Sequence, residues 1–502
     1  MMPVDARHFA DSRKAWIVAV LALTAISLGP IWLFQFPAMQ DYPQHLAQSN
    51  ILMSKDSPGL DYRDNFECRF KVAPYMTFYW VTAGFSYFLP VEIAGRIAVS
   101  LYVLGIALLV LGLGSRSKEE GPKWGLLVFF PFLFNQNYFL GVTNYLYSLF
   151  LLFFALLDHQ KFCESHLGIW SICRQLLWQL LLFLTHPFTY LVFAFLAAVQ
   201  SFFYLWERSQ VQRGLFSSAP GALVVILWYF AANFDKGGST ASPVWLNPIT
   251  SFEYYLLMFS GMRWLGGVDK LVAALWAAMV LLMISAFFVQ DSRTDKSFRR
   301  YLLYFGLATI SVLALPFRIG NYTFINLRIA AISYFFLGLI CGQIRLKGIS
   351  SISCVVLVVA LLSFSVQKQW RISEEIKEIE PIVKLIPKNS PVLPLVFDRS
   401  SPELDRRYFD MHLHDYIYYH LIVGGGVTPY FFKQDMTPVH YLPGREPPAP
   451  GEYDPYHFLW EKYSTAYRYF IVRSAPKAFI QYIQNFTDVI GHSGKWLLLE
   501  KR

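Results

Sequence analysis

The feature that most limits the fold of this sequence is a series of long apolar segments separated by short charged ones, from residues 16–36 to residues 349–366. A soluble domain carries about 25% charged residues. In this chain charged residues make up 15% and apolar residues 55% of 502 positions, which is too little charge to cover a water-facing surface. The pattern excludes a cytosolic enzyme, a disordered scaffold and a secreted disulfide-rich protein. It indicates a chain embedded in a bilayer.

A transmembrane helix needs about 20 mostly apolar residues, because only a helix satisfies its own backbone hydrogen bonds in lipid. By this criterion we predict an all-α polytopic membrane bundle of about 11 transmembrane helices. The predicted spans are 16–36, 93–114, 124–138, 139–157, 175–185, 187–205, 220–233, 268–290, 301–316, 328–344 and 349–366.

The distribution of Lys and Arg orients this bundle. They are about three times as dense in the loops that the count places on the N-terminal side, which favours a cytoplasmic N-terminus. Residues 74–90 are also apolar, but counting them as a span would invert this bias. Tyr and Trp rings prefer the headgroup level. We therefore predict a membrane bundle over 1–366, whose outer loop 37–92 carries helices lying along the interface.

The composition changes after residue 366, where the chain becomes charged and soluble in character. Continuous apolar runs at 392–398, 469–473 and 495–501 predict buried strands, and helix-like stretches lie between them. We therefore predict a small α/β soluble domain over 367–502 on the outer, periplasmic face of a bacterial inner membrane. The five cysteines show neither a plausible disulfide pair nor metal-ligand spacing.

Asp41 and His45 are the first candidate catalytic residues. Asp41 follows the first predicted span, and His45 lies four residues later on the same helical face. This arrangement places a carboxylate and an imidazole at the outer water–lipid boundary, where the polar head group of a membrane-bound substrate would lie. Helix capping is the alternative, with Asp41 as the cap, Pro43 in the first turn and His45 facing water. Capping does not exclude catalysis.

Further polar residues fall on the same outer side. Arg318 and Arg328 are candidates for binding a phosphate, because a guanidinium can hold it bidentately, although snorkelling to lipid headgroups would also place arginines there. Ionisable groups near membrane depth are costly and are therefore functional candidates. We add Arg263 to the phosphate-binding residues, and His186, Glu253, Asn137 and Asn321 to a substrate cavity.

Two motifs in the C-terminal region have ordinary explanations. The spacing of His412, His414 and His420 fits no standard zinc site, so we name no metal ligand. The glycines at 424–426 lack the Lys-Ser/Thr pair of a phosphate-binding loop, and a turn is the better interpretation.

With these motifs, the sequence resembles the GT-C superfamily of membrane glycosyltransferases, which includes protein O-mannosyltransferases and lipid A aminoarabinose transferases. The resemblance begins with an acidic motif after the first span, AMQDYPQHLAQSNIL, followed by a long outer loop. Next, APYMTFYWVTAGFSYFLPVEIAGRIAVSLYVLG is similar to the family's proline-started interfacial segment and Arg-containing second span. The architecture is similar over the whole chain, whereas the motifs cover only residues 38–116.

The resemblance implies transfer of a sugar from a polyprenyl-phosphate carrier to an acceptor on the outer side of the membrane. Asp41 occupies the position of the family's acidic residue, which acts as a general base or helps to bind a divalent cation. Here Asp-Tyr-Pro replaces the usual Asp-Glu or Asp-x-Asp, so the second carboxylate is missing. The cofactor is left unassigned, with a divalent cation as an open alternative.

The partners expected from this resemblance are a polyprenyl-phosphate-linked sugar, membrane lipids and an unidentified glycan, lipid or protein acceptor. No nucleic acid is expected, because the basic residues lie in short clusters between apolar runs. Two other classes stay open: a transporter or flippase of a lipid-linked sugar, and a non-catalytic relative that organises a cell-envelope assembly. We see no internal repeat of the kind that transporters show.

Overall fold

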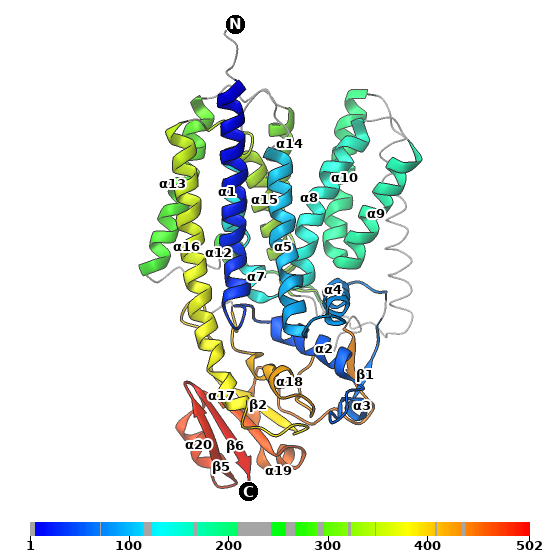
Figure 1. Ribbon diagram of the computed structural model, residues 1–502, viewed down its shortest axis with the longest axis vertical. Helices are drawn as coiled ribbons and strands as arrows, with labels where there is room; N and C mark the ends of the chain where they lie inside the picture. Colours follow the sequence, from blue (N-terminus) through cyan, green and yellow to red (C-terminus); the bar gives the residue numbers. More distant parts are fainter. Residues whose placement is uncertain are drawn as a thin grey trace. The chain divides into compact units, whose positions relative to one another are not determined.

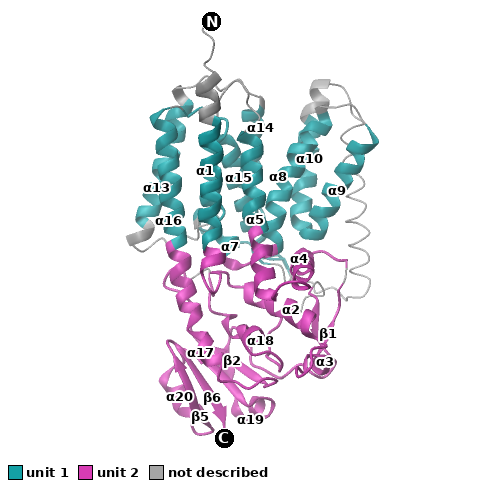
Figure 2. Ribbon diagram, viewed as in Figure 1, with its two compact units in different colours: residues 1–29, 101–138, 144–366 teal, residues 30–100, 139–143, 367–502 magenta. Residues whose placement is uncertain are grey.

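A computed structural model (Figure 1) describes residues 6–70, 72–114, 123–164, 168–208, 242–257, 267–289, 296–319, 323–346, 348–406, 409–432 and 437–502. The chain divides into two compact units, coloured separately in Figure 2. Unit 1 comprises residues 1–29, 101–138 and 144–366, and unit 2 comprises residues 30–100, 139–143 and 367–502.

The described part of unit 1 is mostly helical. Five described helices are long and apolar enough to cross a membrane, by length and composition: Arg13–Leu33, Val91–Gly114, Thr143–Cys163, Lys270–Phe287 and Ile349–Val383. The helices that contribute to this unit are α1 (Ala6–Leu33), α5 (Val91–Gly114), α8 (Thr143–Glu164), α9 (Ile169–Thr185), α10 (Pro187–Arg208), α12 (Pro248–Leu257), α13 (Gly267–Val289), α14 (Lys296–Ala314), α15 (Ile325–Cys341) and α16 (Ile349–Lys377).

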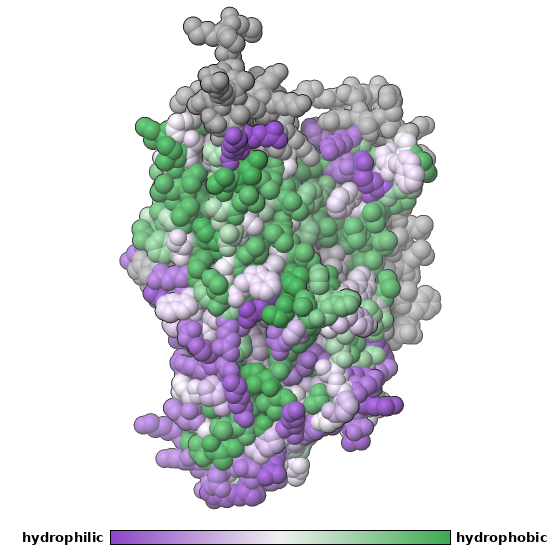
Figure 3. Space-filling view, viewed as in Figure 1, coloured by the Kyte–Doolittle hydropathy of each residue, from purple (hydrophilic) through white to green (hydrophobic). Residues whose placement is uncertain are grey.

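The surface of these helices is apolar, as expected for a protein that lies in lipid. Figure 3 shows apolar side chains over the outer faces of the helices. Val18, Leu108, Leu281 and Val356 are each about 60% exposed or more. So many exposed large apolar side chains would be a liability in water. We therefore treat the protein as an integral membrane protein.

The predicted span at 124–138 is wrong. These residues form a 3-10 helix, η1 (Trp124–Val128), and two short helices, α6 (Phe129–Phe132) and α7 (Gln136–Leu140). Asn135 explains the break, because its side chain donates to the carbonyl of Phe132 and accepts a bond from the backbone of Asn137. The next long helix, α8, begins only at Thr143. The predicted span at 220–233 lies outside the described residues, and the count of about 11 stays a prediction.

Within the apolar stretch 74–90 the chain forms α4 (Thr77–Ser86). Ten residues of helix are too few to cross a bilayer. Phe78 and Tyr79 are buried, whereas Tyr87 and Phe88 just beyond the helix are strongly exposed. The segment therefore combines a packed face with an apolar end, which is the pattern expected of a helix at an interface.

Unit 2 contains a four-stranded sheet of order β2-β4-β6-β5. Strands β2 (Val392–Val396) and β4 (Tyr469–Arg473) are parallel, and β6 (Trp496–Lys501) is antiparallel to both β4 and β5 (Thr487–Ser493). As predicted, the C-terminal region contains a small sheet, and three of its strands are the three apolar runs. Strand β5 was missed because most of its residues are exposed. The core beneath the sheet includes Leu393, Leu395, Phe470, Val472 and Leu499.

The remaining elements of unit 2 connect the first outer loop to the C-terminal region. Strand β1 (Phe66–Cys68) pairs with β3 (Val439–Tyr441), so residues from both segments share one small sheet. The other elements are α2 (Tyr42–Ser54), α3 (Tyr62–Asn65), α17 (Ile379–Val383), η3 (Asp415–Tyr418), α18 (Tyr419–Ile422), η4 (Pro455–His457), α19 (Trp460–Tyr463), η5 (Ser464–Ala466) and α20 (Lys477–Ile483).

Candidate functional site

Asp41 immediately precedes α2 and occupies its N-cap position, but its side chain makes no capping hydrogen bond. The capping alternative is therefore right about the positions of Asp41 and Pro43, but the Asp41 side chain does not cap the helix. The backbone N–H of Asp41 donates instead to the carbonyl of Leu140 at 3.0 Å. Gly141 lies beside it with a φ of 78°, and a Cβ there would come within 2.8 Å of the Asp41 nitrogen. Only glycine permits this close approach. The approach and the backbone hydrogen bond hold the main chain at Asp41 in place.

The carboxylate of Asp41 faces His414. Nδ1 of His414 lies 3.1 Å from Oδ1 of Asp41, and Nε2 lies 3.3 Å from Oε1 of Glu452. The imidazole is 3% exposed, whereas the side chains of Asp41 and Glu452 are 20% and 21% exposed. A buried imidazole therefore joins two carboxylates that both reach solvent.

The charge of this group follows from its surroundings. Burial would lower the pKa of His414, but the charges and hydrogen bonds of Glu452 and Asp41 outweigh it and raise the pKa to about 10. At neutral pH His414 is therefore an imidazolium between two carboxylates. A buried charge is tolerated only when it is paired in this way.

Neighbouring side chains hold this group in place. Gln40 donates from Nε2 to Oδ1 of Asp41 at 3.4 Å and accepts a bond from the backbone of Asp410 at 3.1 Å. The hydroxyl of Tyr416 donates to Oε1 of Glu452 at 3.2 Å. Oδ2 of Asp41 has no hydrogen-bond partner among the described residues. One oxygen of this carboxylate is therefore held, and the other is available.

His45 lies one helical turn after Asp41, as expected from the sequence. Its Nδ1 lies 2.8 Å from the hydroxyl of Tyr79, and its ring packs against Phe78 and Phe432 with centroid distances of 5.7 and 5.4 Å. Burial lowers the pKa of His45 to about 4 against the charge of Asp41. At neutral pH His45 is therefore an uncharged imidazole, which can accept or donate one hydrogen bond but supplies no cation.

In unit 1 the structure brings two of the predicted residues together around Tyr145. The hydroxyl of Tyr145 donates to the backbone carbonyl of Arg328, and the guanidinium of Arg328 lies 6.0 Å from the ring centroid. The ring of His186 lies 5.2 Å from the same ring, and its Nδ1 is 3.4 Å from the hydroxyl of Thr189. His186 is buried and Arg328 is half-buried.

The other predicted residues are more dispersed. Arg318 is exposed, and its backbone pairs with Val244 in an isolated bridge. Glu253 is exposed on α12, whereas Asn137 is buried. Asn137, Glu253 and Arg318 belong to unit 1, whereas Asp41 belongs to unit 2. Arg263 and Asn321 lie outside the described residues.

His414 and Glu452 are functional candidates that the sequence alone did not assign to this site. The only signal was the cluster MHLHD, which we tested for zinc spacing. His412 in the same cluster joins two other carboxylates, Asp415 at 2.7 Å and Glu375 at 2.9 Å. Within the described ranges, no group of three or more His, Cys, Asp or Glu side chains is arranged to hold a metal ion.

The third histidine of this region is structural. Nε2 of His420 lies 2.9 Å from the hydroxyl of Thr428, and burial lowers its pKa to about 3. The glycines at 424–426 all have positive φ, as expected for the predicted turn. The backbone of Gly426 donates to Oδ1 of Asp61, which ties the turn to the first outer loop.

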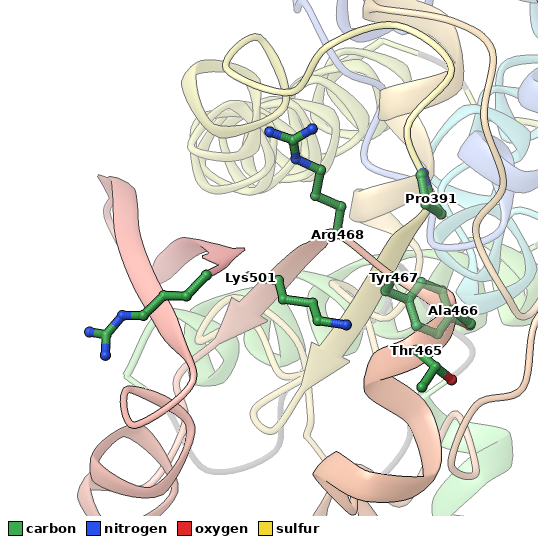
Figure 4. A pocket seen from close by; sticks show the side chains of 7 residues that line it. Pro391, Thr465, Ala466, Tyr467, Arg468 and Lys501 are labelled. Atoms are coloured by element: carbon green, nitrogen blue, oxygen red, sulfur yellow. The ribbon is translucent and has the colours of Figure 1, made fainter.

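A separate surface pocket of about 380 Å³ lies beside the last strand of unit 2 (Figure 4). Its three cations are already engaged: Arg468 with Glu500, Lys501 with the carbonyl of Ser464, and Arg502 with Asp488. None of the predicted site residues lines it. The lining residues are Pro391, Thr465, Ala466, Tyr467, Arg468, Lys501 and Arg502.

No family model matches the chain, and no curated protein matches it. Among solved structures, ArnT from Cupriavidus metallidurans bound to undecaprenyl phosphate aligns with 97% of this chain and 98% of its own, at 13% identity and a TM-score of 0.46. ArnT is a GT-C lipid A aminoarabinose transferase, one of the enzymes that the sequence resembles. A likeness at this level carries no argument about activity, so a function has to be inferred from the chain's own residues.

Proposed function

We propose that the protein is a membrane glycosyltransferase that moves a sugar from a polyprenyl-phosphate donor to an acceptor on the outer side of the membrane. One observation supports this above all others. The carboxylate of Asp41, placed directly after the first membrane helix, is held through Oδ1 by a buried imidazolium and keeps Oδ2 available. A fixed, partly exposed carboxylate that follows a membrane helix in the sequence suits a base that acts on a lipid-linked substrate.

The proposed step needs a base and a cation. The hydroxyl oxygen of the acceptor attacks the anomeric carbon, and Oδ2 of Asp41 takes the hydroxyl proton. The bond between the anomeric carbon and the phosphate oxygen breaks, and the lipid phosphate leaves with the bonding electron pair. A cation beside this phosphate stabilises the charge that develops on it. The acceptor gains the sugar, and the proton remains on Asp41 until it passes to water.

Arg328 is the best supported candidate for the phosphate. It is half-buried, it stacks near Tyr145, and it shares that ring with His186. A guanidinium in such surroundings keeps its charge and can hold two phosphate oxygens. Arg318 is exposed and could bind a phosphate without rearrangement of packed side chains. Arg263 and Asn321 remain candidates from the sequence.

The location of the reaction follows from the predicted topology. We place the protein in a bacterial inner membrane, with the N-terminus in the cytoplasm and the C-terminal region in the periplasm. Membrane lipids and a polyprenyl-phosphate-linked sugar are the proposed partners, and the acceptor is a hydroxyl-bearing molecule of the envelope.

The direct test is transfer by the purified protein. Radiolabelled sugars on undecaprenyl or dolichyl phosphate are supplied with an envelope extract as acceptor, and the label on acceptor molecules is measured. We expect transfer by the wild type and none by Asp41→Asn. The matched control is Asp56→Asn, just after α2. The carboxylate of Asp56 is largely exposed, and its contact with Arg63 is long, at 4.0 Å.

Other outcomes would overturn the proposal. Full activity of Asp41→Asn would remove this carboxylate from the mechanism. Movement of the labelled donor across liposomes without transfer to any acceptor would indicate a transporter. A wild-type protein that neither transfers nor moves the donor would indicate a non-catalytic assembly protein.

A further inference from the structure

Two histidines of the segment 411–415 each join two carboxylates, but the two groups differ in what they expose. His412 joins Asp415, which is 1% exposed, to Glu375. His414 joins Asp41 and Glu452, both of which are about one-fifth exposed. Residues i and i+2 point in different directions, so one short segment serves two separate groups. In the first group one carboxylate, Asp415, is buried and only Glu375 reaches solvent, at 23% exposure, whereas in the second group both carboxylates reach solvent.

The geometry of the second group points to a role for the imidazole in placing Asp41. Both ring nitrogens lie within ion-pair distance of a carboxylate, Nδ1 at 3.1 Å from Asp41 and Nε2 at 3.3 Å from Glu452, so a turn of the ring would weaken both contacts. Nδ1 attracts Oδ1 of Asp41, to which Gln40 also donates, and these two contacts favour a rotation of the carboxylate in which Oδ2 is left without a protein partner among the described residues. Removing the imidazole would leave Asp41 and Glu452 facing each other as like charges, which repel at short distance.

We propose that His414 is a positioning residue, whose imidazole orients the carboxylate of Asp41 so that Oδ2 meets the acceptor hydroxyl. The proposal rests on the function proposed above. His414 itself touches neither donor nor acceptor in this scheme. Glu452 holds the second nitrogen and thereby fixes the ring. The C-terminal region of the chain therefore takes part in the reaction by holding a residue of the first outer loop.

Among the described residues, the charged and titratable groups that interact with His414 are Asp41 and His45, on either side of the start of α2, and Glu452 from the loop before η4. The ring of Phe432 also packs against His414, at 5.4 Å, and carries no charge. Since His45 is uncharged at neutral pH, His414 supplies the cation of this group.

The test compares His414→Gln with His412→Gln. Glutamine keeps one hydrogen-bonding amide but carries no charge. A misplaced reacting group can cost about 100-fold in rate, so we expect His414→Gln to lower kcat about 100-fold while the Kd for the polyprenyl-phosphate donor stays unchanged. Because the imidazolium charge beside Asp41 is lost, the acid limb of the pH–rate profile should differ from that of the wild type.

His412→Gln is the matched control, because it removes an imidazole from the same segment that also joins two carboxylates. We expect it to lower thermal stability without moving the acid limb. If it fails to fold, His457→Gln replaces it, since His457 is exposed and pairs only with Asp454 at 2.5 Å. The double variant His414→Gln/Glu452→Gln should recover part of the lost rate, because the like-charge contact is gone.

The outcomes distinguish a failure of the positioning role of His414 from a failure of the proposed transferase function. A folded His414→Gln variant with wild-type kcat and an unchanged acid limb would overturn the positioning role, while an inactive Asp41→Asn would leave the transferase in place. An active Asp41→Asn would overturn both. Equal shifts of the acid limb in His412→Gln and His414→Gln would also overturn it, since a general loss of packing would then explain the effect.

Discussion

The ion-paired state of His414 predicts a specific dependence of stability on pH. Its pKa is about 10 in the folded protein, against 6.5 for a free imidazole. At about 1.4 kcal/mol per pH unit, this difference corresponds to at most roughly 5 kcal/mol of stabilisation. The pKa is raised on folding, so the stabilisation is complete below pH 6.5. It is lost as the pH rises towards 10.

The assay is thermal unfolding of the purified protein in detergent, measured from pH 6 to pH 10. Other groups also change charge at alkaline pH, so the informative quantity is the difference in stability between the wild type and His414→Gln. We expect the wild type to lose its advantage in thermal stability over His414→Gln across this interval. Glu452→Gln should lose less stability, because one of the two carboxylates that raise the pKa of His414 is gone. Parallel curves for the wild type and His414→Gln at every pH would refute the imidazolium assignment.

Three further predictions follow from the fold and the site. Gly141→Ala should lower both transfer and thermal stability, by roughly 1–3 kcal/mol, because of its positive φ and the 2.8 Å approach to Asp41; an unchanged melting temperature and rate would contradict this. Arg328→Lys should weaken binding of labelled polyprenyl phosphate at least about tenfold, because a lysine cannot hold two oxygens; equal affinity in a filter-binding assay would remove Arg328 from the donor site. Phe470→Ala should destabilise unit 2 by about 3–5 kcal/mol, since Phe470 is fully buried, and a shift in the denaturation midpoint measures it.

The fold could be predicted where apolar residues run continuously. Strands β2 and β4 are buried at every position, and such runs are visible in the sequence. Strand β5 is mostly exposed and shows no such signal. The predicted span at 124–138 was wrong because hydropathy ignores the side-chain hydrogen bonds of Asn135, which end the helix. Local polar chemistry overrode the apolar composition there.

The candidate site could be predicted only in part. Asp41 is visible in the sequence because it follows an apolar span, and His45 because it lies one helical turn later. His414 and Glu452 lie far along the chain, and nothing local in the sequence connects them to Asp41. Their contact depends on the packing of residues 30–100 with residues 367–502 in unit 2. Pairing between distant segments is a tertiary property, and composition and periodicity do not report it.

The most direct test of the central claim is a single-turnover measurement with radiolabelled donor, in which the wild type and Asp41→Asn are compared at saturating protein. If Asp41 takes the acceptor proton, the wild type converts the bound donor to labelled acceptor, and the variant binds the donor equally well but forms no product. Product formation by Asp41→Asn at the wild-type rate would contradict the claim.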